Sequence, residues 1–282
     1  MTESASPPDA ENELSRRTAR LEKLVQRFGD PFQRTQFGKT HAANQIKEKY
    51  VALPAGAKTN DRVTVAGRIL AIRNSGMFIV ILDDTDGLQI FHDLKLLPTE
   101  RADLLKLLDL GDIIGVTGFV RRTPRGEITV DAAELLVLAK ALEPPPEKFH
   151  GLKDVDIRFR HREQDLVATP STRETLRARC RITAAIRQFL DERGFLEVET
   201  PMLHVIPGGA LAKPFVTHHN KLDMPLYLRV APELHLKRLV IGGVAEKLFE
   251  INRCFRNEGV SRVITRNSPR LSFIRPMSIS RP

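Results

Sequence analysis

The sequence has no tryptophan, only two cysteines and no long apolar run. Cys180 and Cys254 lack the spacing of metal ligands and are too few for a disulfide framework, so we expect a reducing, cytoplasmic setting. No stretch approaches the roughly 18 apolar residues that cross a bilayer, so we expect no membrane span. The polar N-terminus also lacks the apolar core of a secretory signal. With 41% hydrophobic and 28% charged residues, the composition is that of a globular protein.

The net charge gives a weak indication of a polyanionic partner. Lysine and arginine number 44 and aspartate and glutamate 35, a formal charge of 44 − 35 = +9. The segment 262–282 holds five arginines and no acidic residue, so the remainder carries 39 − 35 = +4. About half of the basic signal therefore lies at the C-terminal end.

The length of 282 residues is sufficient for two domains. Residues 1–12 are rich in Ser, Pro and Glu, and we expect them to be disordered. Residues 13–61 form a predicted helical extension, whose first helix ends at Gly29. The remaining face of this helix is basic and either follows nucleic-acid phosphates or is simply solvated. Its basic residues are Arg16, Arg17, Arg20, Lys23 and Arg27.

Residues 62–142 predict an OB-fold barrel. Five short strands are expected, with a helix at about 98–108 between the third and the fourth. Such barrels bind single-stranded nucleic acid by stacking bases on exposed aromatic rings beside basic groups. Arg73, Phe78 and Gln89 are the candidates for contacting an unpaired base. Alternatively, Phe78 is an ordinary core residue.

A proline-rich linker at 143–147 is expected to separate the barrel from a second domain. Beyond it we predict a helix over 171–193, a stop at Gly194 and a strand over 195–200 that ends at Pro201. The apolar positions of this helix predict a buried stripe. The stripe comprises Ile182, Ile186, Phe189 and Leu190.

Two segments of the second domain are candidates for ligand binding. The adjacent glycines Gly208 and Gly209 allow close approach of the backbone to a ligand, or form only a flexible loop. Pro232 and Glu233 fit the start of a helix. Glu233 either complements the helix dipole or binds a substrate ammonium. His218 and His219 alone are weak evidence for a metal.

Residues 249–261 are predicted to form a strand that runs into a turn at Gly259. Arginine and glutamate two residues apart in a strand lie on one face. On spacing alone, such a face forms a solvated ion pair, or else binds a phosphate and the amino group of a base.

Several short segments resemble class II lysyl-tRNA synthetases. They are K-F-H-G-L (148–152), E-V-E-T-P-M (197–202), I-P-G-G-A (206–210), P-F-x-T-H-H-N (214–220), A-P-E-L-x-L-K-R (231–238) and F-E-I-N-R-x-F-R-N-E-G (249–259). The resemblance implies an α+β fold, with an N-terminal OB-fold barrel followed by the first part of an antiparallel-sheet catalytic domain over 148–262. It also implies that the helix, glycine, strand and proline of 171–201 are motif 1, the homodimer interface.

The resemblance further implies ATP-dependent activation of L-lysine and its transfer to tRNA(Lys). Arg256 matches the motif 2 arginine at the α-phosphate, and Glu258 matches the carboxylate that meets adenine. Glu233 matches the acid that binds the α-amino group of lysine, and Gly209 the backbone that lines the lysine pocket. Mg²⁺ is expected with ATP, and no metal ligand is expected in this chain. The barrel is expected to read the anticodon through Arg73, Phe78 and Gln89.

After Arg262 the sequence departs from the family. Allowed codons exist that, read from the third base of each codon, give H-N-P-E-F-T-S-I-E-F-H-Q-A-Y-V-D-F-E-T, which restores the family continuation. We therefore hypothesise that residues 263–282 are a frameshifted tail. The sheet left behind is expected to expose unpaired edges and the chain to be inactive by itself. The alternatives are a tRNA-binding remnant and a ligase that modifies protein rather than tRNA; the intact barrel argues against the latter.

Overall fold

The computed structural model describes residues 8–146, 152, 154–208, 211–257 and 267–274. Of the segment 267–274 it describes the backbone only. The chain divides into two compact units, residues 1–170 and 171–282, and each is considered by itself. The predicted linker at 143–147 thus precedes the division between the units.

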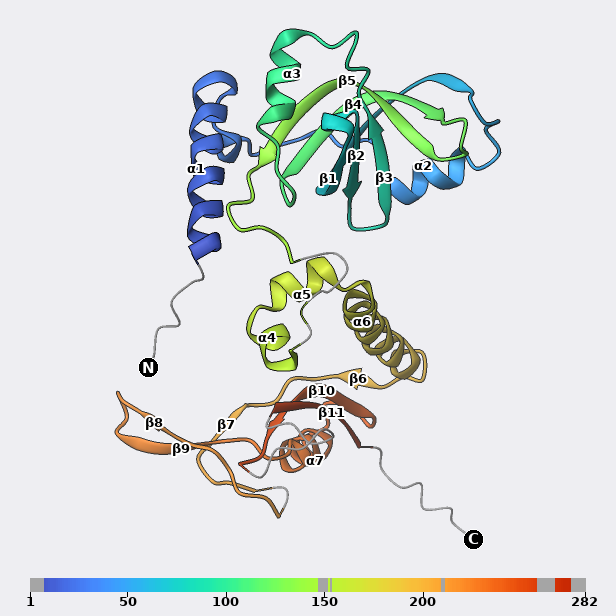
Figure 1. Cartoon of the computed structure of the whole chain (residues 1–282). Coiled ribbons are helices and arrows are strands. Elements are labelled where there is room, and N and C mark those ends of the chain that lie inside the picture. Colours follow the sequence, from blue (N-terminus) through green and yellow to red (C-terminus); the bar gives the residue numbers. More distant parts are fainter. Residues whose placement is uncertain (1–7, 147–151, 153, 209–210, 258–266, 275–282) are drawn as a thin grey trace. The chain divides into compact units, whose positions relative to one another are not determined.

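The first unit is built on a closed five-stranded barrel with the strand order β1-β2-β3-β5-β4 (Figure 1). The strands are β1 (Lys58–Arg73), β2 (Phe78–Leu82), β3 (Gly87–Phe91), β4 (Ile113–Arg122) and β5 (Ile128–Ala139). Alternate residues point inward, as the period of two in a strand requires, and form one apolar core. The helix α3 (Thr99–Lys106) lies between β3 and β4 in sequence. The predicted OB-fold is confirmed, with a first strand that begins four residues before residue 62.

The N-terminal helix α1 (Pro8–Phe28) lies beside the barrel (Figure 1). It includes residues 8–12, for which the expectation of disorder is wrong. Gly29 follows the helix with a φ of 83°, the left-handed conformation that glycine readily adopts after a helix. The 3-10 turn η1 (Pro31–Gln33) and the helix α2 (Ala43–Lys49) complete the extension.

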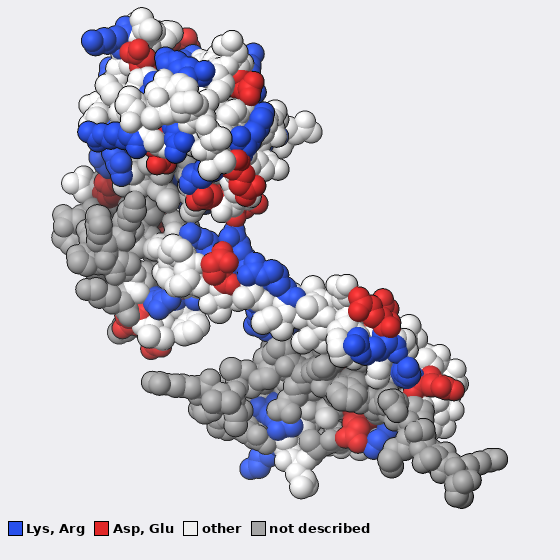
Figure 2. All heavy atoms as spheres, turned by 90° about the vertical axis from the view of Figure 1, so that its right-hand side faces the viewer, with Lys and Arg blue, Asp and Glu red and all other residues white. Residues whose placement is uncertain are grey.

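The arginines of α1 bind the protein rather than forming a free basic face. Arg17 is buried and donates hydrogen bonds to the carbonyls of Leu110 and Ala141, 2.9 and 2.8 Å away. Arg20 pairs with Asp109, and Arg27 with Asp103. On the face shown in Figure 2, lysines and arginines of this unit lie among acidic residues. Neither sequence interpretation, a phosphate-binding or a solvated face, describes Arg17.

Two short helices, α4 (Val155–Arg160) and α5 (Arg162–Ala168), end the first unit. The second unit opens with α6 (Pro170–Asp191), which starts one residue before the predicted helix. Its strands are β6 (Leu196–Glu197), β7 (Leu203–His204), β8 (Val216–His219), β9 (Met224–Leu228), β10 (Leu248–Phe255) and β11 (Asn267–Ile274). They form two three-stranded sheets, β11-β10-β6 and β7-β9-β8. The helix α7 (Glu233–Ile241) connects β9 to β10. The predicted α+β class is confirmed.

One prediction about this unit is wrong. The apolar stripe of α6 is largely uncovered: Ile182 and Phe189 are 60% and 53% exposed, and only Leu190 of the stripe is buried. Within the described residues, β10 is paired along its whole length on one edge but only at Leu248 and Phe249 on the other, so the expectation of unpaired edges is not contradicted. The strand lies antiparallel to β11 over residues 267–274 of the expected tail, and parallel to β6. Residues 263–266 and 275–282 lie outside the described residues.

Candidate functional site

The three predicted base-contacting residues line one cavity of about 850 Å³ on the barrel. Arg73 ends β1 and lies opposite Phe78, the first residue of β2, in the antiparallel ladder. Gln89 lies on β3, which pairs with β2. The cavity is also lined by Lys47, Arg121 and Arg125. Strand pairing therefore brings an aromatic ring, an amide and several cationic groups to one concave surface.

Phe78, which lines the cavity, contacts a second aromatic ring, that of Phe91, in a tilted arrangement. The rings of Phe78 and Phe91 have centroids 5.2 Å apart, and the Arg121 guanidinium lies 3.9 Å from the Phe91 centroid. Arg121 is held there by an ion pair of 2.7 Å with Asp131. A partly exposed ring beside cationic groups is what stacking of an unpaired base requires. The sequence analysis missed Phe91 and Arg121. Both lie near the ends of predicted strands, and this position could have marked them as candidates for the same surface.

Gln89 presents a defined hydrogen-bonding edge. Its side-chain Nε2 donates to Thr129 Oγ1 at 3.0 Å. Because this bond uses the amide nitrogen, the amide oxygen remains an acceptor for a base donor. Phe78 is intermediate in burial, so the alternative of an ordinary core residue does not describe it.

The second unit places Arg256 one residue after the end of β10. Arg256 is partly buried, and its Nε is buried without a hydrogen-bond partner in the described part of the chain. A buried guanidinium nitrogen left unpaired is costly, and an anionic oxygen would satisfy it. The residue thus fits a phosphate ligand. Glu258, its predicted companion at the nucleotide, lies outside the described residues.

The predicted ammonium-binding residue, Glu233, lies in the first turn of α7, half exposed. Its carboxylate accepts a hydrogen bond of 2.6 Å from Lys237 Nζ, one turn along the helix. The carboxylate therefore already binds an alkylammonium, which a substrate amine would displace. Gly209, predicted to line the same pocket, lies outside the described residues.

A buried network connects the segments that carry Glu233 and Arg256. Arg229 Nη1 donates to Glu250 Oε1 at 2.7 Å and to Thr200 Oγ1 at 2.9 Å. The Thr200 hydroxyl donates to Glu250 Oε2 at 2.8 Å. Burial raises the pKa of Glu250, but the hydrogen bonds from Thr200 and Arg229 outweigh it and hold that pKa below the usual range. Sequence reasoning missed this network.

Within the described residues, no group of three or more His, Cys, Asp or Glu side chains could hold a metal ion. None of the described helices is both long and apolar enough to cross a membrane. His218 and His219, which were weak evidence for a metal site, lie on β8. His218 Nε2 contacts the Asp223 carboxylate at 3.1 Å.

Comparison with known families assigns both regions. Residues 63–138 match the OB-fold nucleic acid binding domain of anticodon-binding type, and residues 154–268 match "tRNA synthetases class II (D, K and N)". This chain belongs to the class II tRNA synthetases.

This class II chain is similar to curated lysine–tRNA ligases. It is 47% identical to that of Rhizobium meliloti (strain 1021) over 92% of this chain and 51% of the relative. The corresponding figures are 47%, 95% and 52% for Psychrobacter arcticus, and 45%, 97% and 53% for Rhizobium etli (strain CIAT 652). The chain spans about half the length of the curated relatives it matches.

Proposed function

We propose that the chain carries the tRNA-binding barrel and part of the adenylate-forming site of a lysine–tRNA ligase. The observation that carries this proposal is the identity of 45–47% to lysine–tRNA ligases across more than nine-tenths of the chain. The reaction has two steps: L-lysine and ATP form lysyl-adenylate, and the lysyl group is then transferred to tRNA(Lys). The setting is cytoplasmic.

In the first step the carboxylate of lysine attacks the α-phosphate of ATP. Arg256 stabilises the charge that develops on that phosphate, which its unpaired Nε supports. Glu233 binds the α-amino group and so fixes the carboxylate for attack, while Glu258 meets adenine and the backbone at Gly209 lines the lysine pocket. Catalysis rests on positioning and charge stabilisation, without a covalent enzyme intermediate. Mg²⁺ accompanies ATP and screens its phosphate charge.

The barrel reads the anticodon of tRNA(Lys). An unpaired base stacks on Phe78, the Gln89 amide oxygen accepts a hydrogen bond from it, and Arg73 binds the backbone. The shared cavity of these three residues supports this role.

By itself the 282-residue chain completes no lysylation, because it corresponds to about half of each relative. A frameshift after Arg262 accounts for the departure from the family continuation. Determining the nucleotide sequence across codons 258–282 tests this point directly. Codons for residues 263–282 that cannot encode the family continuation in the shifted frame would refute it.

The experiment that tests the function is lysine-dependent exchange between ATP and pyrophosphate, measured together with tRNA(Lys) binding by the purified chain. We expect salt-dependent binding of tRNA and no exchange. Exchange would show that the half-length chain is already an adenylating enzyme and would refute its inactivity. Absence of tRNA binding would refute the role of the barrel.

A second candidate function is a tRNA-binding remnant without catalysis. It is favoured by the completeness of the barrel cavity, in which all three predicted residues meet. Binding of ATP and lysine to the second unit separates the two candidates, since a remnant binds neither.

A further inference from the structure

Arg229 is a charged residue of the second unit whose side chain is fully buried. It lies one residue after β9 and four before Glu233. Its guanidinium is connected on two sides: Nη1 pairs with Glu250 on β10, and Nε donates to the Arg253 carbonyl at 2.9 Å. Nη2 is buried without a hydrogen-bond partner in the described part of the chain, so the guanidinium is held through Nη1 and Nε alone.

The main chain at the same position makes further connections. The Arg229 carbonyl accepts a hydrogen bond of 2.9 Å from the Phe255 amide, immediately before Arg256. The Arg229 amide donates to the Met202 carbonyl, also at 2.9 Å. One residue thus joins three segments: the stretch after β6, the start of α7, and the end of β10.

Glu250 completes the connection from the other side. Its carboxylate accepts hydrogen bonds from the amide and hydroxyl of Thr200, at 3.1 and 2.8 Å, and from Asn252 Nδ2 at 2.6 Å. All of its partners are neutral except Arg229, so the arginine is its counter-ion in this network. The pair therefore joins the end of β9 to β10, strands of two different sheets, through charge and hydrogen bonds together.

We propose that Arg229 is a positioning residue, which sets the separation between the carboxylate of Glu233 and the guanidinium of Arg256. This inference rests on the proposed function, in which these two groups bind lysine and the α-phosphate. Arg229 touches neither substrate. Its side chain acts by joining this position to β10, at Glu250 and at the Arg253 carbonyl three residues before Arg256, while four residues of chain lead from it to Glu233.

The test uses a variant that removes the connection without leaving a buried charge. Arg229→Met together with Glu250→Met replaces the ion pair with apolar side chains, a change that is often neutral or stabilising. The matched control, Arg187→Met with Glu197→Met, removes an exposed pair of the same unit, with Nε and Oε1 2.9 Å apart. Nitroxide labels at Leu234→Cys and Asn257→Cys, both exposed positions, report the separation of the two sites in a Cys180→Ser background.

We expect the unfolding temperature of the Arg229–Glu250 variant to stay close to that of the unsubstituted chain, while the distribution of label distances broadens about twofold. The control should retain the narrow distribution. ATP affinity, measured by calorimetry, should fall about tenfold in the variant and remain unchanged in the control. An unchanged distance distribution in a folded variant would overturn the inference.

If the double variant fails to fold, Arg229→Lys provides the second test, because it keeps the charge but loses the donors that reach Thr200 and the Arg253 carbonyl at once. It should broaden the distribution, and a narrow distribution would again overturn the inference. The label distances need no ligand. If the unsubstituted chain binds neither ATP nor lysine, the proposed function is refuted. The label distances still decide whether Arg229 is a positioning residue.

Discussion

The ammonium of Lys140 lies 2.7 Å from the carboxylate of Asp112, and the side chains of both residues are fully buried. Lys140 Nζ also contacts Asp109 Oδ2 at 2.5 Å and the Leu107 carbonyl at 2.9 Å. Asp109 in turn pairs with Arg20 of α1. Lys140, which directly follows β5, thus connects the end of the barrel to the loop 107–112. The N-terminal helix α1 contacts the same loop through Arg20 and Asp109.

Removing one partner of this pair is expected to be strongly destabilising. Lys140→Met leaves two carboxylates without their buried counter-ion and should lower the free energy of unfolding by about 3–5 kcal/mol. Urea denaturation followed by circular dichroism measures the loss. As control, Arg62→Met removes an exposed ion pair with Glu134 and should cost no more than about 1 kcal/mol. Equal losses in the two variants would contradict this prediction.

A second prediction concerns Gly115 on β4, where the tip of the Phe37 ring lies close to the backbone. A Cβ at Gly115 would be 2.4 Å from Phe37 Cζ, so Gly115→Ala must displace the ring. We expect a loss of about 1–3 kcal/mol in the free energy of unfolding, from strain and lost packing.

The control for Gly115 is Gly38→Ala, because nothing lies within 4 Å of the added Cβ there. The double variant Gly115→Ala/Phe37→Ala should cost less than the sum of the two single changes, since removing the ring also removes the clash. Additive losses would show that the two residues do not contact one another.

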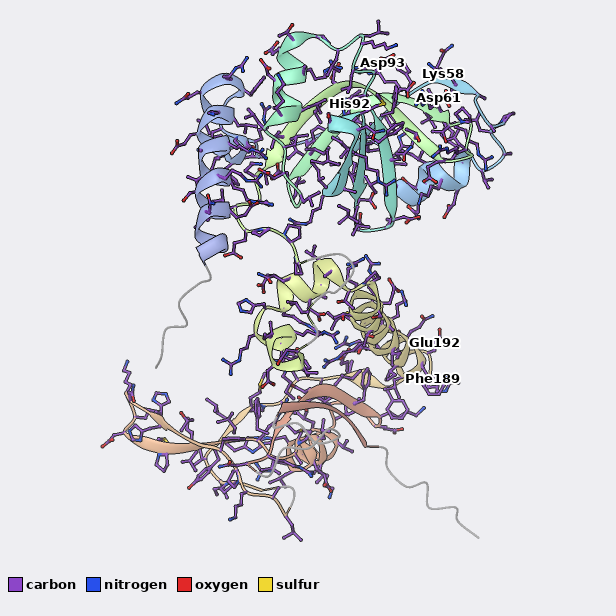
Figure 3. All side chains as sticks on the ribbon, viewed as in Figure 1. Lys58, Asp61, His92, Asp93, Phe189 and Glu192 are labelled. Atoms are coloured by element: carbon purple, nitrogen blue, oxygen red, sulfur yellow. The ribbon has the colours of Figure 1, made fainter. Side chains whose placement is uncertain are left out.

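His92 makes the stability of the barrel unit dependent on pH. The residue follows β3 within this unit (Figure 3) and is completely buried, and neither ring nitrogen has a hydrogen-bond partner among the residues that the structure describes. Burial and the nearby Arg101 charge lower the pKa of His92 from 6.5 to about 4. The folded state therefore binds the proton less readily than the unfolded state. Stability is retained above pH 6.5 and is lost as the pH falls toward the folded pKa.

Integrated over that shift, His92 should account for a loss of about 2–3 kcal/mol between pH 7 and about pH 4.5. Because carboxylates also titrate there, the measurement is the difference between the unsubstituted chain and His92→Phe in urea unfolding at both pH values. The exposed His161→Gln serves as control and should keep the full pH dependence. A His92→Phe variant with unchanged pH dependence would refute the assignment.

The fold of the barrel and three of the residues that line its cavity could be predicted from this single sequence. Alternating apolar residues and turn glycines fixed the strands, and the pairing of those strands then placed Arg73, Phe78 and Gln89 around one cavity. The period of two determines both the fold and the face on which each side chain lies. The candidate site of the first unit was therefore predictable.

The Arg229 network was not predictable in this way. In L-R-V-A-P, Arg229 reads as an ordinary basic residue between apolar neighbours, and its partners are 21 residues later, at Glu250, and 29 residues earlier, at Thr200. No local pattern encodes such a long-range ion pair. The pairing of β11 with β10 was missed for a related reason: backbone hydrogen bonds complete a sheet edge whichever side chains the strand carries.

The barrel cavity gives a prediction about tRNA binding. Phe78→Ala removes the ring on which we expect a base to stack, and it should weaken tRNA(Lys) binding by about 1–3 kcal/mol without changing its salt dependence. Arg73→Gln should instead reduce the slope of log affinity against log salt by about one. Filter binding at several salt concentrations measures both. Interchanged effects would contradict the assigned roles.

The exposed stripe of α6 gives the last prediction, which concerns the homodimer that the resemblance to motif 1 implies. Helical periodicity predicted an apolar stripe correctly but could not state what covers it. Ile182 and Phe189 are largely exposed, and Phe189 lies near Glu192 at the C-terminal end of α6 (Figure 3). Exposed apolar surface of this kind marks a contact with another chain. We expect that a second copy covers it, as motif 1 implies.

The variant Ile182→Glu/Phe189→Glu introduces two charges into that stripe and should convert a dimer to monomer, because a buried unpaired carboxylate costs several kcal/mol at an interface. Sedimentation equilibrium measures the mass of each species. Ala184→Glu, an exposed change on the opposite face of the same helix, should leave the dimer intact. The unfolding temperature of the double variant, measured as monomer, should not fall below that of the dissociated parent, because neither side chain is part of the core. A parent chain that sediments as a monomer at all concentrations would show that the stripe is not a self-association surface.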